Sequence, residues 1–248
     1  MTKKISPRSL LNKNKNYNKS ISIENLKLDD ISIKDLKLSS DESNFDRYIN
    51  LRSLLNSVSS CQISDAYNGL TRRSGVISNL KSINNLKAYG SIVTCKTSSN
   101  DWGTSVLAID KCNEGDILFL VANDNSAAIW GELASTCAKN KKIRGTAVYG
   151  SSRDLDALYH MDFPVFSVDS VSNAGTPLGL GKINVDVTLE DITISPGDFF
   201  FGDETGVVVI PKKLFNEVMN ETLDIKIKES KIISLIDKGN SLSDIVGL

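Results

Sequence analysis

The sequence predicts an α/β fold in which sheet and helices form layers, and three observations support this prediction. Short apolar runs separated by turn residues are typical of strands. Helix-like stretches lie between several of these runs, and a long amphipathic pattern follows Pro211. Because strands dominate the middle of the chain and helices flank them, we expect a layered α/β sandwich with a C-terminal amphipathic helix.

The individual elements follow from local patterns. Strong turn signals at Gly115-Asp116 and Pro196-Gly197-Asp198 separate apolar runs. The runs predicted to be strands are residues 90–97, 116–121, 145–149, 165–168, 182–187 and 206–210. Helices are expected at residues 105–109, 132–139 and 154–159, with a capped helix start at Ser64-Asp65-Ala66-Tyr67 and a C-terminal helix through Leu214, Val218, Leu223 and Ile227.

Composition fits an ordinary globular protein. The 248 residues suffice for one or two hydrophobic cores, and 40% of them are hydrophobic. A net charge of −1 provides no basic field, so we expect no nucleic-acid partner. No apolar run reaches the roughly 18 residues of a membrane span, and the N-terminus lacks the apolar core of a secretory signal. We therefore expect a soluble cytoplasmic protein without a membrane partner.

Cysteine and histidine give little support to a thiolate or imidazole metal site. Cys61, Cys95, Cys112 and Cys137 are widely spaced, and no C-x-x-C pair occurs. We predict reduced cysteines with packing roles. His160 is the only histidine in the sequence and is expected to pack or to lie on the surface.

The character of the chain changes near residue 45. Before it, Ser, Asn, Lys and Asp dominate, which predicts a flexible extension over residues 1–45 and an α/β domain over residues 46–248. Apolar and polar residues alternate at Ile31-Ser32-Ile33 and Leu36-Lys37-Leu38. This alternation is compatible with short strands or with a segment that docks a partner. A helical stretch is expected through Leu51, Leu54 and Leu55.

The most informative feature is Glu132, followed after twenty residues by Arg153-Asp154. Glu132 opens a helix-like run, whereas Arg153 and Asp154 follow an apolar strand-like run. A helix N-terminus offers unpaired N–H groups to an anion, and charged residues just beyond a strand lie where α/β proteins usually bind ligands. We therefore expect the two ends to meet in one site.

Several short motifs together make the chain similar to a known family from about Ser59 to Gly239. It resembles the family of regulator of ribonuclease activity A and the 4-hydroxy-4-methyl-2-oxoglutarate/4-carboxy-4-hydroxy-2-oxoadipate aldolases. The order and spacing of the motifs carry the resemblance: Ile63-Ser64-Asp65-Ala66, Asn100-Asp101, Glu114-Gly115-Asp116, Trp130-Gly131-Glu132-Leu133-Ala134, Gly150-Ser151-Ser152-Arg153-Asp154, Phe163-Pro164-Val165-Phe166, Pro196-Gly197-Asp198 and the run from Gly202 to Pro211.

The resemblance implies an α/β/β/α sandwich of the swivelling-domain type and a homotrimer or hexamer. The aldolases share the signature that Glu132, Arg153 and Asp154 match, and the ribonuclease-binding branch tends to lose the Asp. In the resembling aldolases a C-terminal glutamate of a neighbouring subunit approaches the site, and Glu229 is the candidate here, with a solvated helix charge as the alternative. The chain departs from the family at Ala122-Asn123-Asp124-Asn125, where a Gly-rich turn is usual, and at Tyr149-Gly150, where Asp-Gly is common.

The resemblance implies a metal-dependent lyase, and the chemistry of these residues suits one. Mg²⁺ or Mn²⁺ prefers oxygen ligands, so we expect Asp154 to bind the metal directly and Glu132 to bind it through water. Arg153 is permanently charged and offers a planar fork for a keto oxygen, a carboxylate or the C4 oxygen. Contacts to the substrate are expected from Arg153, from Asn100, and from the helix start, at Gly131, Glu132, Leu133 and Ala134.

The predicted function is thus a pyruvate-type aldolase that acts on a small 4-hydroxy-2-oxo acid, with oxaloacetate-type decarboxylation at the same site. The alternatives are a non-catalytic binding protein of the ribonuclease-regulator kind and a related metal-enolate enzyme. Simpler roles are also open for individual residues. Asn100-Asp101 is also typical of a turn or cap, Asp203-Glu204 of a turn before a strand, and Trp130 of a residue that packs the helix start or forms a pocket wall.

Overall fold

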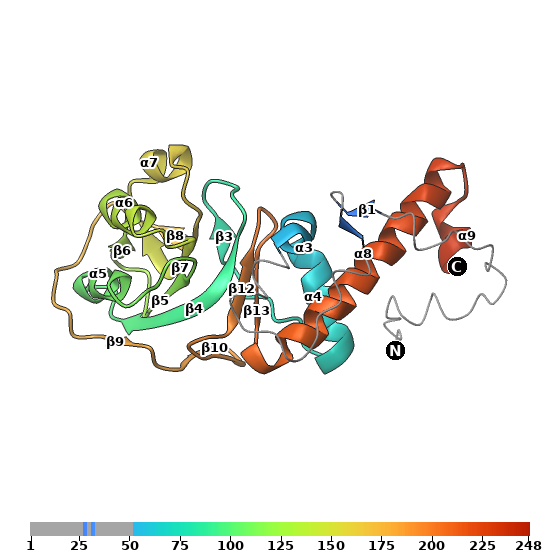
Figure 1. Cartoon of the computed structure of the whole chain (residues 1–248). Coiled ribbons are helices and arrows are strands. Elements are labelled where there is room, and N and C mark those ends of the chain that lie inside the picture. The colour runs from blue at the N-terminus through green and yellow to red at the C-terminus, as the bar shows by residue number, and fades with distance from the viewer. Residues whose placement is uncertain (1–26, 29–30, 33–51) are drawn as a thin grey trace. The chain divides into compact units, whose positions relative to one another are not determined.

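The computed structural model describes residues 27–28, 31–32 and 52–248 (Figure 1). The chain divides into two compact units, one formed by residues 1–74 and 216–248 and the other by Gly75–Phe215. The predicted boundary at residue 45, the helical position Leu51 and the alternating segment at residues 36–38 lie outside the described residues. No helix in the described part of the chain is long and apolar enough to cross a membrane.

The described part of the first unit is mainly helical. Its described strands, β1 (Lys27–Leu28) and β2 (Ile31–Ser32), form a short antiparallel pair. Its helices are α3 (Arg52–Ser57), α4 (Ser60–Thr71), α8 (Phe215–Asp237) and α9 (Leu242–Val246). The long helix α8 is the predicted C-terminal helix, which the structure confirms.

The predicted helix start at Ser64 is wrong, because α4 begins one turn earlier. Ser59 is its N-cap, and its side chain accepts a hydrogen bond from the Gln62 backbone while the Gln62 side chain accepts one from the Ser59 backbone. This reciprocal capping satisfies two N–H groups that a helix end leaves free. The Ser64 hydroxyl donates to the Ser74 carbonyl instead.

The second unit is built on a mixed sheet with the strand order β13-β12-β4-β5-β7-β8-β3, to which β6 adds beside β7 and β9 beside β4. Strands β4, β5, β7 and β8 are parallel, and β6 is parallel to β7, whereas the remaining pairs are antiparallel. The bounds are β3 (Lys81–Ser82), β4 (Ala88–Thr97), β5 (Ile117–Ala122), β6 (Ala128–Trp130), β7 (Gly145–Ser152), β8 (Val165–Ser170), β9 (Lys182–Ile183), β12 (Phe199–Gly202) and β13 (Val207–Ile210).

The sheet bends into two layers at strand β4, because this strand belongs to both layers. Its first residues pair with β12, and its residues from Ile92 onward pair with β5. The hairpin of β10 (Val187–Leu189) and β11 (Ile192–Ile194) packs with the inner face. Phe119, Phe166 and Phe200 form the centre of that inner core, and each is fully buried.

Helices cover the other face of the parallel strands (Figure 1). They are α5 (Gly103–Ile109), α6 (Glu132–Asn140) and α7 (Leu155–His160), and they contribute Ala108, Ala138 and Leu158 to a second core against β4, β5 and β7. The predicted mixed α/β fold with layers and a C-terminal helix is therefore confirmed. The predicted strand at residues 182–187 is wrong in its extent, since β9 ends at Ile183 and β10 begins at Val187.

Candidate functional site

The pairing of β6 with β7 creates the candidate site. Trp130 at the end of β6 is the register partner of Ser152 at the end of β7, and the backbone N–H of Arg153 donates to the Trp130 carbonyl at 3.0 Å. Helix α6 begins two residues after Trp130, and Arg153 and Asp154 follow β7 directly. The carboxyl ends of parallel strands thus bring the two halves of the Glu132…Arg153-Asp154 motif together, as the sequence predicts.

Asp154 caps the neighbouring helix. Its Oδ2 accepts a hydrogen bond from the backbone N–H of Glu132 at 3.1 Å, at the N-terminus of α6. Gly131 makes this approach possible, because a Cβ at position 131 would lie 2.5 Å from the same oxygen. Asp154 itself adopts a left-handed backbone conformation with φ 59°, which turns the chain from β7 into α7.

Arg153 forms an ion pair with the same carboxylate. Its Nε lies 3.5 Å from Asp154 Oδ2, and the two side chains are 42% and 37% exposed. Partial exposure leaves both charged groups within reach of a small molecule. The other carboxylate oxygen, Asp154 Oδ1, makes no hydrogen bond or ion pair with the described residues.

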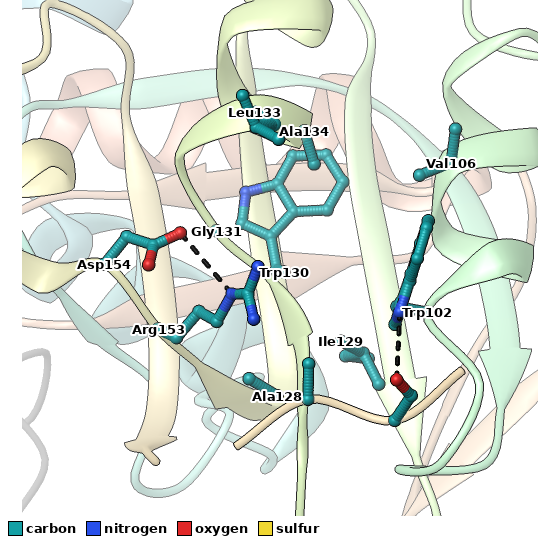
Figure 2. Close-up of a pocket in the computed structure, with 12 residues that line it drawn as sticks. Trp102, Val106, Ala128, Ile129, Trp130, Gly131, Leu133, Ala134, Arg153 and Asp154 are labelled. Carbon is teal, nitrogen blue, oxygen red and sulfur yellow. Dashed lines mark hydrogen bonds and ion pairs between the residues drawn. The ribbon is translucent and has the colours of Figure 1, made fainter. Parts of the chain in front are cut away.

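A pocket of about 350 Å³ lies beside this pair (Figure 2). Figure 2 shows Arg153 and Asp154 at one end of the pocket and Trp102 and Val106 at the other. Trp130 lies between these two pairs. The remaining lining residues are small or apolar: Ala128, Ile129, Gly131, Leu133, Ala134, Ala174 and Gly175. Among the lining residues that the structure describes, only Arg153 and Asp154 carry charge.

Both tryptophans are fixed by hydrogen bonds from their indole nitrogens. Trp130 Nε1 donates to Ser135 Oγ at 2.7 Å within α6, and Trp102 Nε1 donates to the Gly175 carbonyl at 3.1 Å. Each indole N–H is therefore satisfied by the protein itself, and the rings present apolar surface to the pocket. Trp130 is 3% exposed, so it both packs the start of α6 and forms a pocket wall, which are the two roles that its sequence position allowed.

The wall at Gly175 belongs to a strap, residues 173–181, that is held by Asp101. The Asp101 carboxylate accepts hydrogen bonds from the backbone N–H groups of Gly179 and Leu180 at 2.8 and 2.9 Å, and from Thr104 Oγ1 at 2.6 Å. Asp101 is 2% exposed. Burial by itself raises the pKa of this carboxyl, but the hydrogen bonds outweigh burial and hold the pKa well below its ordinary value.

The other site residues predicted from the sequence are placed as follows. Leu133, Ala134 and Gly131 line the pocket together with Arg153 and Asp154. Glu132 is exposed at the start of α6 and is not a lining residue. Asn100 also lies outside the lining, and its carbonyl accepts from the Thr176 backbone at 2.8 Å, which gives it a role in holding the strap. Glu229 lies on α8 in the first unit, where its carboxylate accepts a hydrogen bond from Gln62 Nε2.

Sequence reasoning missed Trp102 and the strap. The turn or cap predicted at Asn100-Asp101 is confirmed, because Asp101 Oδ1 accepts a hydrogen bond from the Thr104 N–H at the start of α5, but the contacts of Asp101 with the strap were not predicted. The strap itself carries no motif, and Ala174 and Gly175 reach the pocket through non-local contacts, such as the hydrogen bond that the Ala128 N–H donates to the Asn173 carbonyl.

The less specific residues have local structural roles. Asp203 Oδ1 accepts from the backbone N–H groups of Thr205 and Gly206, which confirms the predicted turn before β13. His160 is exposed and lies near Asp156, in agreement with a surface role. In the unusual turn after β5, Asn123 Oδ1 accepts from the Ser99 backbone at 2.8 Å, so this turn is tied to the end of β4.

The carboxylates of the site are compatible with a metal ion that keeps several water ligands. No group of three or more His, Cys, Asp or Glu side chains that could hold a metal ion is found among the described residues. Mg²⁺, however, commonly binds through one or two carboxylates and keeps water in its other positions. The half-exposed Asp154, whose Oδ1 makes no hydrogen bond or ion pair with the described residues, fits such a site together with Glu132 at the adjacent helix start.

Comparison with known proteins identifies relatives that match from α4 in the first unit through most of the second unit. Residues 60–209 match the model of the RraA-like family, described as Aldolase/RraA. An uncharacterized protein from Methanocaldococcus jannaschii is 40% identical over 162 residues, which cover 64% of this chain and 78% of that protein. A protein from Halalkalibacterium halodurans named "Putative 4-hydroxy-4-methyl-2-oxoglutarate aldolase" is 34% identical over 151 residues, covering 60% of this chain and 71% of that protein.

Solved structures share the fold. An uncharacterized protein from Pseudomonas syringae has a TM-score of 0.70 and 24% sequence identity, covering 78% of this chain and 92% of that chain. The RNA-processing inhibitor RraA from Thermus thermophilis has a TM-score of 0.55 and 18% identity, covering 60% of this chain and 92% of that chain. These two likenesses concern the fold alone.

Proposed function

Because this chain belongs to the RraA-like family, which joins aldolases and RraA proteins, we propose that it is a divalent-metal-dependent aldolase of the pyruvate type. In this proposal it cleaves or forms the C3–C4 bond of a 4-hydroxy-2-oxo acid. The observation that carries the proposal is the placement of Arg153 and Asp154 beside the N-terminus of α6, at one end of a small-molecule pocket. The name of the relative from Halalkalibacterium halodurans supports the same reaction class.

The start of α6 is the proposed site for the substrate carboxylate. The first hydrogen bond of the helix ladder runs from Ser135 N to the Gly131 carbonyl, so the N–H groups of Leu133 and Ala134 precede the ladder. Leu133 and Ala134 also line the pocket. The Glu132 N–H already donates to Asp154, so we assign carboxylate binding to Leu133 and Ala134 rather than to all three.

Arg153 is proposed to stabilise the oxygen on which negative charge develops. Its guanidinium cannot lose its proton at neutral pH, and its Nε is already oriented by Asp154. The other nitrogens of the planar fork can then donate to a keto oxygen or to the C4 oxygen of the bond that breaks. Charged donors fixed in advance at such an oxygen contribute strongly to catalysis, because they need no reorganisation during the reaction.

Asp154 and Glu132 are the proposed ligands for Mg²⁺ or Mn²⁺, Asp154 directly and Glu132 through water. Held by these two residues, such an ion would supply electrostatic stabilisation for the negative charge that develops on the pyruvate unit. The same requirement for charge stabilisation makes oxaloacetate-type decarboxylation a second reaction of this site. We further propose a cytoplasmic homotrimer or hexamer in which Glu229 of one subunit contributes to catalysis in another.

The alternatives are a non-catalytic regulator of the RraA kind and a related metal-enolate enzyme. The family description includes both aldolase and RraA, which keeps the regulator as a candidate. The retained carboxylate at Asp154, together with its Arg153 ion pair, favours an enzyme, because a binding protein has no need for an oriented charge pair in a small pocket.

The test is release of pyruvate from a panel of 4-hydroxy-2-oxo acids, measured with and without Mg²⁺ or Mn²⁺. We expect metal-dependent release by the wild type and loss of release in Asp154→Asn. Asp156→Asn is the matched control, since Asp156 lies two residues away with a side chain that is 99% exposed. Absence of pyruvate from every substrate and with either metal would favour the regulator.

A further inference from the structure

The pocket has one charged end and one apolar end. Arg153 and Asp154 form the charged end, and the apolar wall on the other side of Trp130 consists of Trp102, Val106 and Ile129 (Figure 2). The polar atoms of the two indoles are not available to a ligand, since Trp102 Nε1 donates to Gly175 and Trp130 Nε1 donates to Ser135. A ligand group that reaches past Trp130 therefore meets hydrocarbon and aromatic surface.

The charge balance of the pocket limits what the ligand can carry. The 2-oxo acid end of the proposed substrate requires the helix start and Arg153. Once Arg153 binds that end, no other described lining residue offers a cation to a second carboxylate. Burying a carboxylate against apolar side chains without a partner is strongly unfavourable, whereas burying an alkyl or aryl group there is favourable.

From these two observations we infer that the substrate carries an apolar alkyl or aryl group, not a second carboxylate, on the C4 side. The inference rests on the proposed function and names its substrate class. The inferred substrate differs from the one in the name of the relative from Halalkalibacterium halodurans, because 4-hydroxy-4-methyl-2-oxoglutarate is a dicarboxylate.

The reaction balances as a retro-aldol cleavage. In the substrate the C3–C4 bond breaks, its electron pair stays on C3 as the enolate, and the C4 hydroxyl loses its proton as C4 becomes a carbonyl. The hydroxyl proton passes to water, and C3 takes up one proton from water to yield pyruvate, so no net proton is gained or lost. The second product is an apolar aldehyde or ketone, where a dicarboxylate substrate would give a 2-oxo acid such as glyoxylate.

Binding can be measured by intrinsic fluorescence, because Trp102 and Trp130 are the two tryptophans of the sequence and both line the pocket. Full-length protein in Mg²⁺ buffer is titrated with 2-oxo-4-phenylbutanoate and with 2-oxoglutarate, which differ in the group on C4 and lack the hydroxyl needed for cleavage. We expect the phenyl ligand to bind about tenfold more tightly or better. Equal or tighter binding of 2-oxoglutarate overturns the inference.

A pair of variants tests whether the apolar wall is the cause. Val106→Lys places a cation on the apolar wall. It is expected to raise the affinity for 2-oxoglutarate and to lower the affinity for 2-oxo-4-phenylbutanoate. Leu107→Lys is the control, because Leu107 is the next residue of α5, is 49% exposed and is not a lining residue. The inference fails if Val106→Lys leaves the ratio of the two affinities as it is in the Leu107→Lys control.

Cleavage separates this inference from the proposed function. Pyruvate release is compared for 4-hydroxy-2-oxo-4-phenylbutanoate and 4-hydroxy-2-oxoglutarate. A higher kcat/KM for the phenyl substrate supports both proposals, and a higher kcat/KM for the dicarboxylate overturns the substrate class while the aldolase stands. If the phenyl ligand binds selectively and neither substrate releases pyruvate, the aldolase proposal falls and the apolar ligand class is retained.

Discussion

Asp154 Oδ2 accepts the backbone N–H of Glu132 at 3.1 Å, so the carboxylate that follows one strand caps the helix that follows the neighbouring strand. The contact joins residues that are 22 positions apart. It gives Asp154 a structural role in addition to its proposed role as a metal ligand, and the two roles respond differently to substitution.

Asp154→Asn is expected to abolish lyase activity with little loss of stability. Asparagine keeps an oxygen acceptor for the Glu132 N–H and tolerates the left-handed backbone of position 154, but it removes the ligand charge. Asp154→Ala loses the acceptor as well and strains a backbone at φ 59°, which we expect to cost about 1–2 kcal/mol of folding free energy. Urea denaturation and pyruvate release measure the two effects. A large stability loss in Asp154→Asn would contradict this separation.

Arg153→Lys is expected to lower kcat substantially while the fold is retained. Lysine keeps the positive charge but lacks the planar fork. If Arg153 acts as an oxyanion donor, the transition state loses about 2.7–4 kcal/mol of stabilisation. The backbone bond from Arg153 to Trp130 is unaffected by the change. The control is Arg73→Lys at an exposed position. A near-wild-type kcat removes Arg153 from the catalytic residues.

Metal removal is expected to abolish lyase activity reversibly. Treatment with a chelator should eliminate pyruvate release, and Mg²⁺ or Mn²⁺ should restore it, because Asp154 and Glu132 offer the oxygen ligands that these ions prefer. Cys137→Ser should respond in the same way as the wild type, since Cys137 is an exposed free thiol with no role in the site. Full activity of the stripped protein contradicts the metal-dependent mechanism.

Asp101→Asn is expected to destabilise the protein and loosen the strap in a pH-dependent manner. The folded pKa of Asp101 lies below its unfolded value, so its stabilising effect is fully present above the ordinary carboxyl pKa of about 3.9 and is lost as pH falls through the folded pKa. At neutral pH we expect a loss of about 1–3 kcal/mol, because several hydrogen bonds to a buried carboxylate weaken together.

The stability difference between wild type and Asp101→Asn should shrink as pH falls below about 4. Hydrogen exchange at Gly179 and Leu180, whose N–H groups donate to Asp101, should accelerate at neutral pH. Asp110→Asn is the control, because that side chain is 76% exposed. Unchanged exchange at Gly179 and Leu180 would show that Asp101 does not hold the strap.

Glu229→Gln is expected to lower turnover without changing the oligomer. The amide can still accept a hydrogen bond from Gln62, so the contact between α4 and α8 should survive while the charge is lost. Mixing Glu229→Gln subunits with Asp154→Asn subunits should recover part of the activity, because some mixed sites draw one intact residue from each variant. A monomer by light scattering, or no recovery after verified subunit exchange, rejects a shared site.

The sequence by itself determined most of the secondary-structure elements and the motif formed by Glu132, Arg153 and Asp154. Apolar runs located β4, β5, β7, β8 and β13, because a strand buried on both faces needs a continuous apolar segment. The start of α6 and the end of β7 were also predicted to meet, since parallel strands present their carboxyl ends at one edge of the sheet. Resemblance to a family added the α/β/β/α arrangement of the fold and the aldolase signature that Glu132, Arg153 and Asp154 match.

Only the tertiary structure decided what surrounds that motif. Strand β6 has three residues and no pattern of its own, and its pairing with β7 is what sets Glu132 N–H against Asp154. The apolar end of the pocket depends on Trp102 and on a strap that Asp101 holds from more than seventy residues away. Such contacts are set by packing and by the need of a buried carboxylate for donors, which local sequence patterns do not encode.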